Sequence, residues 1–132
     1  MWYGFDRRLC DAAWDGDAET IRALLADPGV RRAGDPDTAL MHAAHRGHLA
    51  VVCLLLGLGN PLARNSEALW RAARHRRGTC IDVLVPVCRP EVWERWQWDD
   101  LPAASICRIG RLLARLGRPA TPVSRMPEGG AA

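Results

Sequence analysis

The sequence predicts an all-α fold, built as a stack of two-helix repeats, and three observations carry this prediction. Residues 37–56 hold apolar side chains at helical spacing on both sides of Gly47, which indicates a helix, a turn and a second helix. The second of these helices is apolar nearly all round, so it needs cover on more than one side. The same pattern recurs at offsets of 31 and 29 residues, which is typical of a solenoid.

The first copy is expected over residues 6–34. Its second helix, residues 18–25, is apolar on one face and polar on the other, as a terminal helix with water behind it requires. Residues 27–36 are rich in Pro, Gly and Asp and predict a turn and a loop. Trp2, Tyr3 and Phe5 are candidates to cover the open end of this copy. The residues that match the central copy are Leu9, Ala12, Ala13, Gly16, Ile21, Leu24 and Leu25.

The central copy, residues 35–63, carries the clearest signals. Thr38 is the expected N-cap, because its hydroxyl can satisfy an amide of the first turn. Gly47 is expected to end the first helix by entering the left-handed conformation. Gly59 and Pro61 are expected to end the second helix. The apolar stripe of the first helix consists of Leu40, Ala43 and Ala44.

The third copy is expected over residues 64–90, with Ser66 as the N-cap. Arg76 stands where the other copies have their turn glycine, and Gly78 is displaced from that place, so the pattern does not fix where the first helix ends. Pro86 and Pro90 are expected to close the second helix. The residues that match the central copy are Leu69, Ala72, Ala73, Ile81, Leu84 and Val85.

A divergent capping repeat is expected over residues 91–116. It lacks the Ala-Ala pair and holds Trp93, Trp96 and Trp98, of which two are expected to pack on the third repeat while one stays partly exposed. A one-sided apolar stripe then predicts a capping helix. Residues 117–132 are rich in Pro and Gly, and they predict a disordered tail. The stripe consists of Ile106, Ile109, Leu112, Leu113 and Leu116.

These residues resemble the ankyrin repeat. In the central copy Ala39 and Met41 replace the usual Pro and His of that family, and residues 65–87 are similar to a bacterial variant of the repeat. The resemblance covers about residues 9–116, and it implies a right-handed stack of about three repeats plus the cap. The matching residues of the central copy are Thr38, Ala39, Leu40, Met41, Ala43, Ala44, Gly47, His48, Val51, Val52, Leu54, Leu55, Leu56 and Gly59.

The resemblance also implies a function, namely protein–protein interaction through the concave face of the stack. The dense arginine run of residues 71–77 favours a partner protein with an acidic patch. The same residues would equally serve as an ordinary solvated surface. Carried over copy by copy, the partner-binding residues are Trp14, Asp15, Asp35, Asp37, His42, His45, Arg46, Arg64, Arg71, Arg74 and His75, with Asp11 and Ser66 beside them.

Two other functions stay open from the sequence. One is an inhibitor or immunity-type protein that occludes one bacterial enzyme or toxin, and the other is a structural assembly subunit. An inhibitor should bind one partner very tightly as a monomer, whereas an assembly subunit should oligomerise by itself.

Composition and motifs argue against several other classes. The net charge of +3 is too small to indicate nucleic-acid binding, and no apolar run approaches the ~20 residues that span a membrane. The N-terminus lacks the pattern of a secretory signal, so a cytoplasmic location is expected. The five cysteines are odd in number and form no Cys-x-x-Cys pair, which gives neither a disulfide framework nor a zinc site.

Catalysis and cofactor binding are not expected either. His42, His45 and His48 are spaced i, i+3, i+6, but zinc sites normally add Cys or carboxylate ligands in a closed tetrahedron, and the resemblance explains His48 by the Gly-His turn of the family. No spacing assembles a nucleophile with its base, and no glycine-rich phosphate loop is present in the sequence. We therefore expect no enzyme activity, no cofactor, no metal and no small-molecule substrate.

Overall fold

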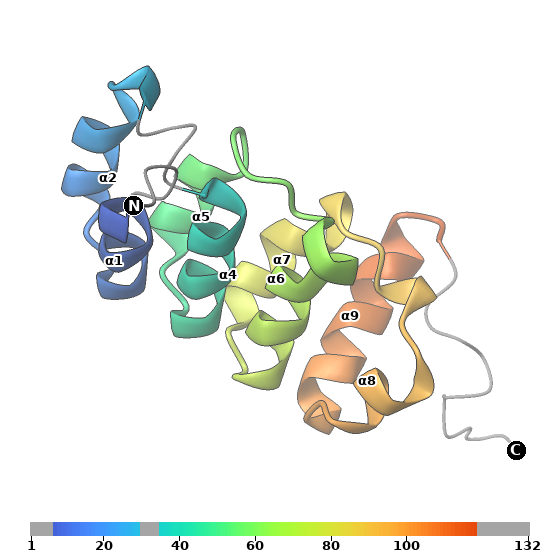
Figure 1. Cartoon of the computed structure of the whole chain (residues 1–132). Helices are drawn as coiled ribbons and strands as arrows, with labels where there is room; N and C mark the ends of the chain where they lie inside the picture. The colour runs from blue at the N-terminus through green and yellow to red at the C-terminus, as the bar shows by residue number, and fades with distance from the viewer. Residues whose placement is uncertain (1–6, 30–34, 119–132) are drawn as a thin grey trace, which may run out of the picture.

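The computed structural model describes residues 7–29 and 35–118, and its regular elements in these ranges are all helical. Three helix pairs follow one another along the stack (Figure 1). The first pair is α1 (Arg7–Asp15) and α2 (Ala18–Leu25), the second is α4 (Pro36–Arg46) and α5 (Leu49–Leu55), and the third is α6 (Ala63–Arg74) and α7 (Gly78–Leu84). The predicted repeat fold is confirmed.

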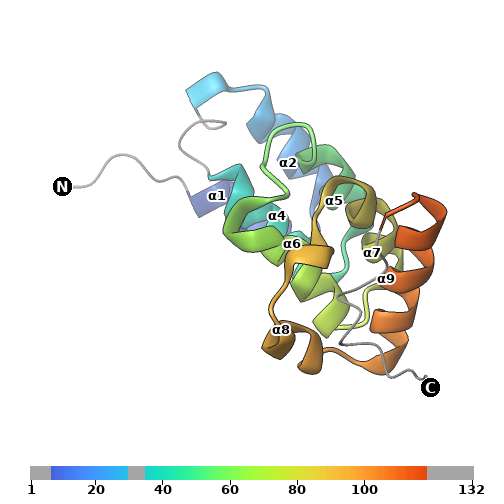
Figure 2. The ribbon, with the colours of Figure 1, turned by 90° about the vertical axis from the view of Figure 1, so that its right-hand side faces the viewer.

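The helices form two layers. Figure 2 shows α1, α4, α6 and α8 (Arg95–Asp99) along one side of the stack and α2, α5, α7 and α9 (Ala103–Arg115) along the other. The core lies between the layers, where Leu40, Leu55 and Leu69 are fully buried. The alanines Ala13, Ala44 and Ala73 are also fully buried, and their small size lets neighbouring first helices approach closely.

The capping region departs most from a repeat. The short 3₁₀ turns Val85–Val87 and Pro90–Val92 lead into α8, whose five residues are too few for a full first helix. The Trp70 indole N–H donates to the Gln97 carbonyl at 3.0 Å and ties α8 to α6. On α9, Ile109 and Leu113 are buried against the stack, while Leu116, the C-cap residue that follows α9, is 46% exposed. The predicted capping helix is therefore present, with an exposed end.

The tryptophans of the cap divide as the sequence predicts. Trp93 and Trp98 are buried, and their rings meet edge to face with centroids 5.2 Å apart. The indole N–H of Trp93 donates to the backbone carbonyl of Asn65 at 2.7 Å, so the cap is hydrogen-bonded to the third repeat. Trp96 is 64% exposed.

Two predicted helix caps are wrong. Helix α4 starts at Pro36, and its N-cap is Asp35, whose carboxylate accepts the backbone N–H of Thr38 at 3.2 Å and its hydroxyl at 2.7 Å. Pro36 suits the first helical position because its missing N–H would have no partner there. Ser66 is buried, and its hydroxyl accepts the backbone N–H of Arg89 at 3.1 Å instead of capping α6.

The roles predicted for Gly59, as a helix end, and for Arg118, as part of a disordered tail, also differ from the structure. Helix α5 ends at Leu55, before Gly59, whose place against α4 is so tight that a Cβ would lie 2.8 Å from the Pro36 carbonyl oxygen. Arg118 falls within the predicted tail, yet it donates to the Glu91 carboxylate at 2.8 and 2.7 Å and to the Cys88 carbonyl at 2.6 Å. The rest of the tail, residues 119–132, and the N-terminal aromatic residues lie outside the described residues.

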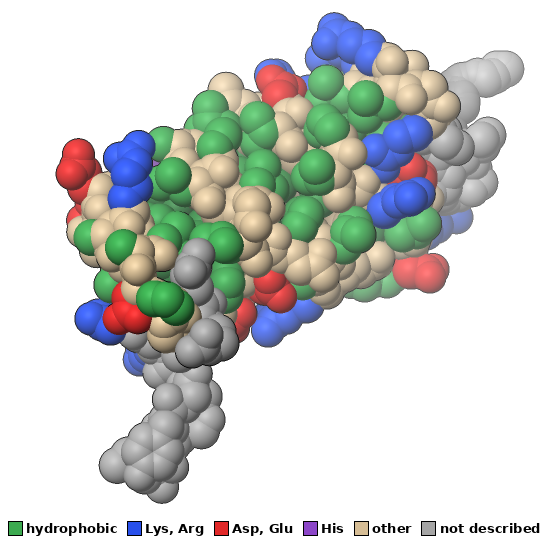
Figure 3. Space-filling view, turned by 90° about the horizontal axis from the view of Figure 1, so that it is seen from above, with side chains coloured by type: hydrophobic (Ala, Val, Ile, Leu, Met, Phe, Trp, Pro, Cys, Tyr) green, Lys and Arg blue, Asp and Glu red, His purple; other side chains and the backbone are tan. Residues whose placement is uncertain are grey.

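Seen from above the stack, the surface carries hydrophobic side chains over much of its middle, with charged groups mainly toward its edges (Figure 3). Exposed apolar side chains follow the second helices of the central and third repeats: Leu58, Leu62 and Val87 are 41%, 45% and 44% exposed. Single exposed apolar residues are normal on protein surfaces, so we assign no role to them.

The turn between the paired helices has the same backbone conformation in all three repeats. Gly16 and Gly47 have φ values of 77° and 79°, and Arg76, which replaces the glycine in the third repeat, has a φ of 60°. The position, and not the residue type, therefore determines where the first helix ends.

Arg76→Gly should stabilise the protein. A side chain in the left-handed region costs roughly 1–2 kcal/mol, which glycine avoids, while the greater freedom of glycine in the unfolded chain removes part of the gain. We expect the free energy of unfolding to rise by about 1 kcal/mol or less, measured by urea denaturation. Arg76→Ala keeps a Cβ at the same φ and should bring no such gain. An equal gain in both variants would show that the arginine side chain, and not the backbone, is the source of strain.

Candidate functional site

The C-terminal ends of the first helices bring four rings into one row, which we call the ring row: Trp14, His42, His45 and His75. The centroid of the Trp14 ring lies 5.5 Å from the centroid of the His42 ring and 5.1 Å from that of His45. The centroids of the His45 and His75 rings are 3.9 Å apart. The guanidinium carbon of Arg46 lies 4.8 Å from the Trp14 ring centroid, within range of a cation–π contact. Trp14 remains 36% exposed, so the row is open to solvent on one side.

The repeat geometry explains why these side chains meet. Trp14 and His45 occupy the same position in successive copies, and so do Arg46 and His75. Because α1, α4 and α6 lie side by side, side chains from equivalent last turns come within contact distance of the next helix (Figure 1). The row therefore follows from the stacking, and each repeat contributes to it.

Hydrogen bonds from the next repeat hold the ends of these helices. His48 Nε2 bonds to the Trp14 carbonyl oxygen at 3.0 Å, and Arg77 Nε donates to the His45 carbonyl at 3.1 Å. These two side chains occupy equivalent positions, directly after the turn. Ser105 Oγ donates in a similar way to the Ala73 carbonyl at 2.6 Å. The ring row is thus carried by helix ends that are fixed to their neighbours.

His48 and Arg77 were not among the predicted site residues. Their position in the repeat could have identified them. Each follows the turn residue of its own repeat and bonds to an otherwise unpaired carbonyl at the end of the first helix of the repeat before it. The space is tight, since a Cβ on Gly16 would lie 2.5 Å from the His48 ring. Glycine at that turn therefore leaves room for the imidazole and also adopts the positive φ without strain.

The environment keeps the two stacked imidazoles neutral. Burial lowers the pKa of His45, and the neighbouring His75 and Arg71 lower it further. Burial also lowers the pKa of His75, followed by the charges of Arg74 and Arg77. At neutral pH His45 and His75 are therefore uncharged aromatic surface with guanidinium groups around them.

These pKa shifts predict a pH dependence of stability. A histidine whose pKa is lowered in the folded state binds protons more readily in the unfolded state. Protonation of the unfolded chain therefore lowers stability only at pH values below the ordinary histidine pKa of 6.5. Stability should fall as the pH drops below 6.5 toward the folded pKa. Denaturant midpoints at pH 7.5 and 5.5 should show this loss in the wild type and a smaller one in His45→Gln/His75→Gln. An undiminished loss in the double variant would assign the effect to other groups.

The remaining predicted site residues divide into two groups. Arg71 pairs with Glu67 on its own helix at 2.7 Å, and Asp15 and Arg74 are exposed at the same helix ends as the ring row. The others lie elsewhere: Asp35 caps α4, the Asp37 carboxylate accepts the Asn60 N–H at 2.6 Å, and Arg64 is exposed near the start of α6. Asp11 is exposed one turn before Trp14, and Ser66 is buried.

Other kinds of site were searched for in the part of the chain that the structure describes. Within residues 7–29 and 35–118 no group of three or more His, Cys, Asp or Glu side chains is placed to hold a metal ion. The five cysteines are all free thiols, and burial raises the pKa of Cys88 to about 12. None of the described helices has the length and apolar character needed to cross a membrane.

Comparison with known proteins gives one match. The model of the family of ankyrin repeats, in three copies, matches residues 9–93. Neither the curated proteins nor the solved structures gave a match. Ankyrin repeats typically serve as protein–protein interaction modules and are generally non-catalytic. With well over half of its length matched, the chain belongs to the ankyrin repeat family.

Proposed function

We propose that the chain binds a partner protein through the ring row and the arginines beside it, on the face that is concave in the family, without catalysing a reaction. The observation that carries this proposal is the contact between the 36% exposed Trp14 and the guanidinium of Arg46, within a ring row to which three repeats contribute. Tryptophan and arginine are the side chains most enriched among the residues that dominate binding energy.

The electrostatics favour an acidic partner. Arg46, Arg71, Arg74 and Arg77 lie around the neutral imidazoles of His45 and His75, and of these arginines Arg71 alone has a carboxylate partner among the described residues. A carboxylate of the partner would find a planar guanidinium fork and an adjacent aromatic surface. Because the helix ends are already held by His48 and Arg77, little ordering entropy is lost on binding.

Affinity capture with matched variants tests the proposal. The full chain, Trp14→Ala and Arg22→Ala are immobilised separately, and the proteins retained from the source cell are compared by mass spectrometry. Arg22 is exposed on α2, in the other layer, and serves as the control. We expect one protein that the wild type and Arg22→Ala retain equally and that Trp14→Ala loses. Equal retention by all three chains would exclude the ring row as the binding site.

A further inference from the structure

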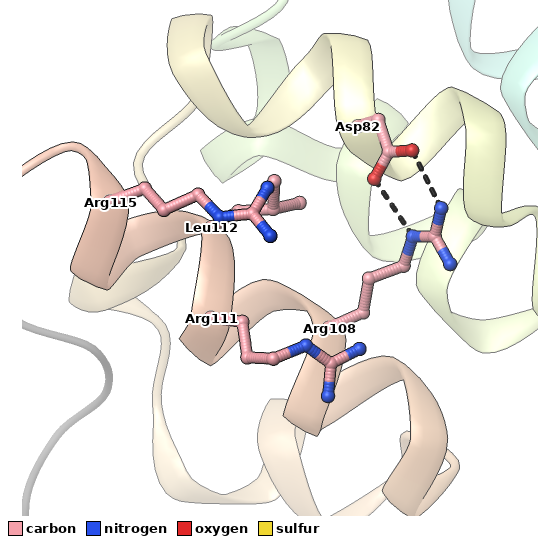
Figure 4. Close-up of a pocket in the computed structure, with 5 residues that line it drawn as sticks. All are labelled: Asp82, Arg108, Arg111, Leu112 and Arg115. Atoms are coloured by element: carbon pink, nitrogen blue, oxygen red, sulfur yellow. Dashed lines mark hydrogen bonds and ion pairs between the residues drawn. The ribbon is translucent and has the colours of Figure 1, made fainter.

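A basic pocket lies in the other layer of the stack, between α7 and α9. Its volume is about 370 Å³, and it is lined by Asp82, Arg108, Arg111, Leu112 and Arg115. The arginines are spaced i, i+3, i+7 along α9, which places them on one face of that helix. In Figure 4 their side chains extend from α9 to the same side, and Asp82 faces them from α7.

The single carboxylate of the pocket is already paired. Asp82 accepts two hydrogen bonds from Arg108, at 2.8 and 2.6 Å, in the fork geometry that guanidinium groups form with carboxylates. The hydrogen bond from Arg108 lowers the pKa of Asp82, and the charges of Arg108 and Arg115 lower it further despite some burial. Asp82 is therefore ionised at neutral pH, and it orients Arg108 at the edge of the pocket.

Arg111 and Arg115 have no such partner. Within residues 7–29 and 35–118 no carboxylate pairs with either of them, whereas Arg108 and Arg118, the neighbouring arginines of this segment, are paired with Asp82 and Glu91. The negative end of the helix dipole accounts for a cation at Arg115, in the last turn of α9. It does not account for Arg111, one turn earlier, because the dipole effect falls off within the last turn.

We propose that this pocket binds a phosphate monoester dianion through Arg111 and Arg115, with Arg108 held beside them by Asp82. Three guanidinium groups and one carboxylate leave two positive charges, which a single phosphate dianion neutralises. Its three terminal oxygens can accept hydrogen bonds from guanidinium forks, the pairing that arginine forms best.

The size of the pocket fits an organic phosphate better than a bare ion. A volume of about 370 Å³ is within the range of small-molecule sites, and Leu112 gives it an apolar wall for the organic part. The phosphate can come from a small metabolite or from a phosphorylated serine, threonine or tyrosine of a protein. The site is independent of the ring row, because it lies in the layer of the second helices, so either proposal can fail without the other.

Titration calorimetry of the full chain with inorganic phosphate, at constant ionic strength in chloride, tests the proposal. We expect saturable binding to the wild type that weakens at least about tenfold in Arg111→Ala/Arg115→Ala, because the double variant removes both guanidinium groups that have no other partner. Arg95→Ala removes an exposed arginine of α8 and should bind like the wild type. Circular dichroism confirms that every variant is folded. The absence of saturable binding, or equal binding by the double variant, would overturn the proposal.

A phosphoserine peptide and its unphosphorylated form identify the source of the phosphate. Tighter binding of the phosphopeptide than of inorganic phosphate would assign the site to a modified protein, and the reverse order to a small phosphate. Binding of the phosphopeptide should weaken from pH 7.5 to 5, because the second proton of a phosphate ester titrates with a pKa of about 6. Equal binding of the unphosphorylated peptide would contradict recognition of a phosphate.

Discussion

Trp93→Ala should lower the free energy of unfolding by about 3–5 kcal/mol, the range for removing a buried tryptophan side chain. Trp93 is 3% exposed, packs edge to face on Trp98, and is the donor that binds the Asn65 carbonyl. Its loss would leave a cavity between the cap and the third repeat, together with a carbonyl without its partner. Chemical denaturation followed by circular dichroism measures the effect.

Two further variants separate the contribution of Trp93 packing from that of its hydrogen bond, and compare this buried tryptophan with an exposed one. Trp93→Phe keeps an aromatic ring but removes the N–H, so it should cost about 1–3 kcal/mol through the unpaired carbonyl and the smaller ring. Trp96→Ala removes the neighbouring 64% exposed tryptophan and should change stability by at most about 0.5 kcal/mol. If Trp96→Ala were as damaging as Trp93→Ala, the assignment of the inward and outward rings would be wrong.

Leu55→Ala should lower the free energy of unfolding by about 2–5 kcal/mol. Leu55 is fully buried at the end of α5, a helix that contacts α2 of the first repeat and α7 of the third, so truncating it leaves a cavity in the core of the stack. Leu58→Ala, three residues later at a 41% exposed position, is the matched control and should cost much less. A denaturant midpoint for Leu55→Ala equal to that of the wild type would refute the central place of this residue.

The fold could be predicted from the sequence because the same pattern of core residues occurs in three copies. The leucines and alanine pairs that recur at offsets of 31 and 29 are the residues that fill the space between layers. Leu24 shows the limit of that argument: it is only partly buried, whereas its counterparts Leu55 and Leu84 are fully buried, because it belongs to the first repeat of the described stack.

Helix ends were predicted less well, since they depend on partners that local patterns do not show. Thr38 looks like a cap, but Asp35 followed by Pro36 starts α4 earlier and uses Thr38 as its partner. Ser66 has the right chemistry for a cap, but its hydroxyl accepts the backbone N–H of Arg89, at the end of the same repeat. Arg118 is held by Glu91, a contact between residues 27 positions apart that composition does not reveal.

The candidate site was predictable where repeat equivalence determines it. Trp14, His45, Arg46 and His75 come from equivalent last turns, and the structure brings them together. Asp35 and Asp37 were carried over by the same argument, but hydrogen bonds within the chain already engage their carboxylates. Equivalence locates a position on the stack, and it does not say whether the side chain there is free for a partner.

Titration calorimetry of the captured partner against single variants tests the central claim most directly. Trp14→Ala should weaken binding by at least about 1 kcal/mol, roughly fivefold in affinity, because it removes the exposed ring that contacts His42, His45 and Arg46. Arg22→Ala should leave the affinity unchanged, and circular dichroism should show both variants folded. If Arg22→Ala abolished binding while Trp14→Ala bound like the wild type, the partner would lie on the opposite face and the ring row would not be the binding site.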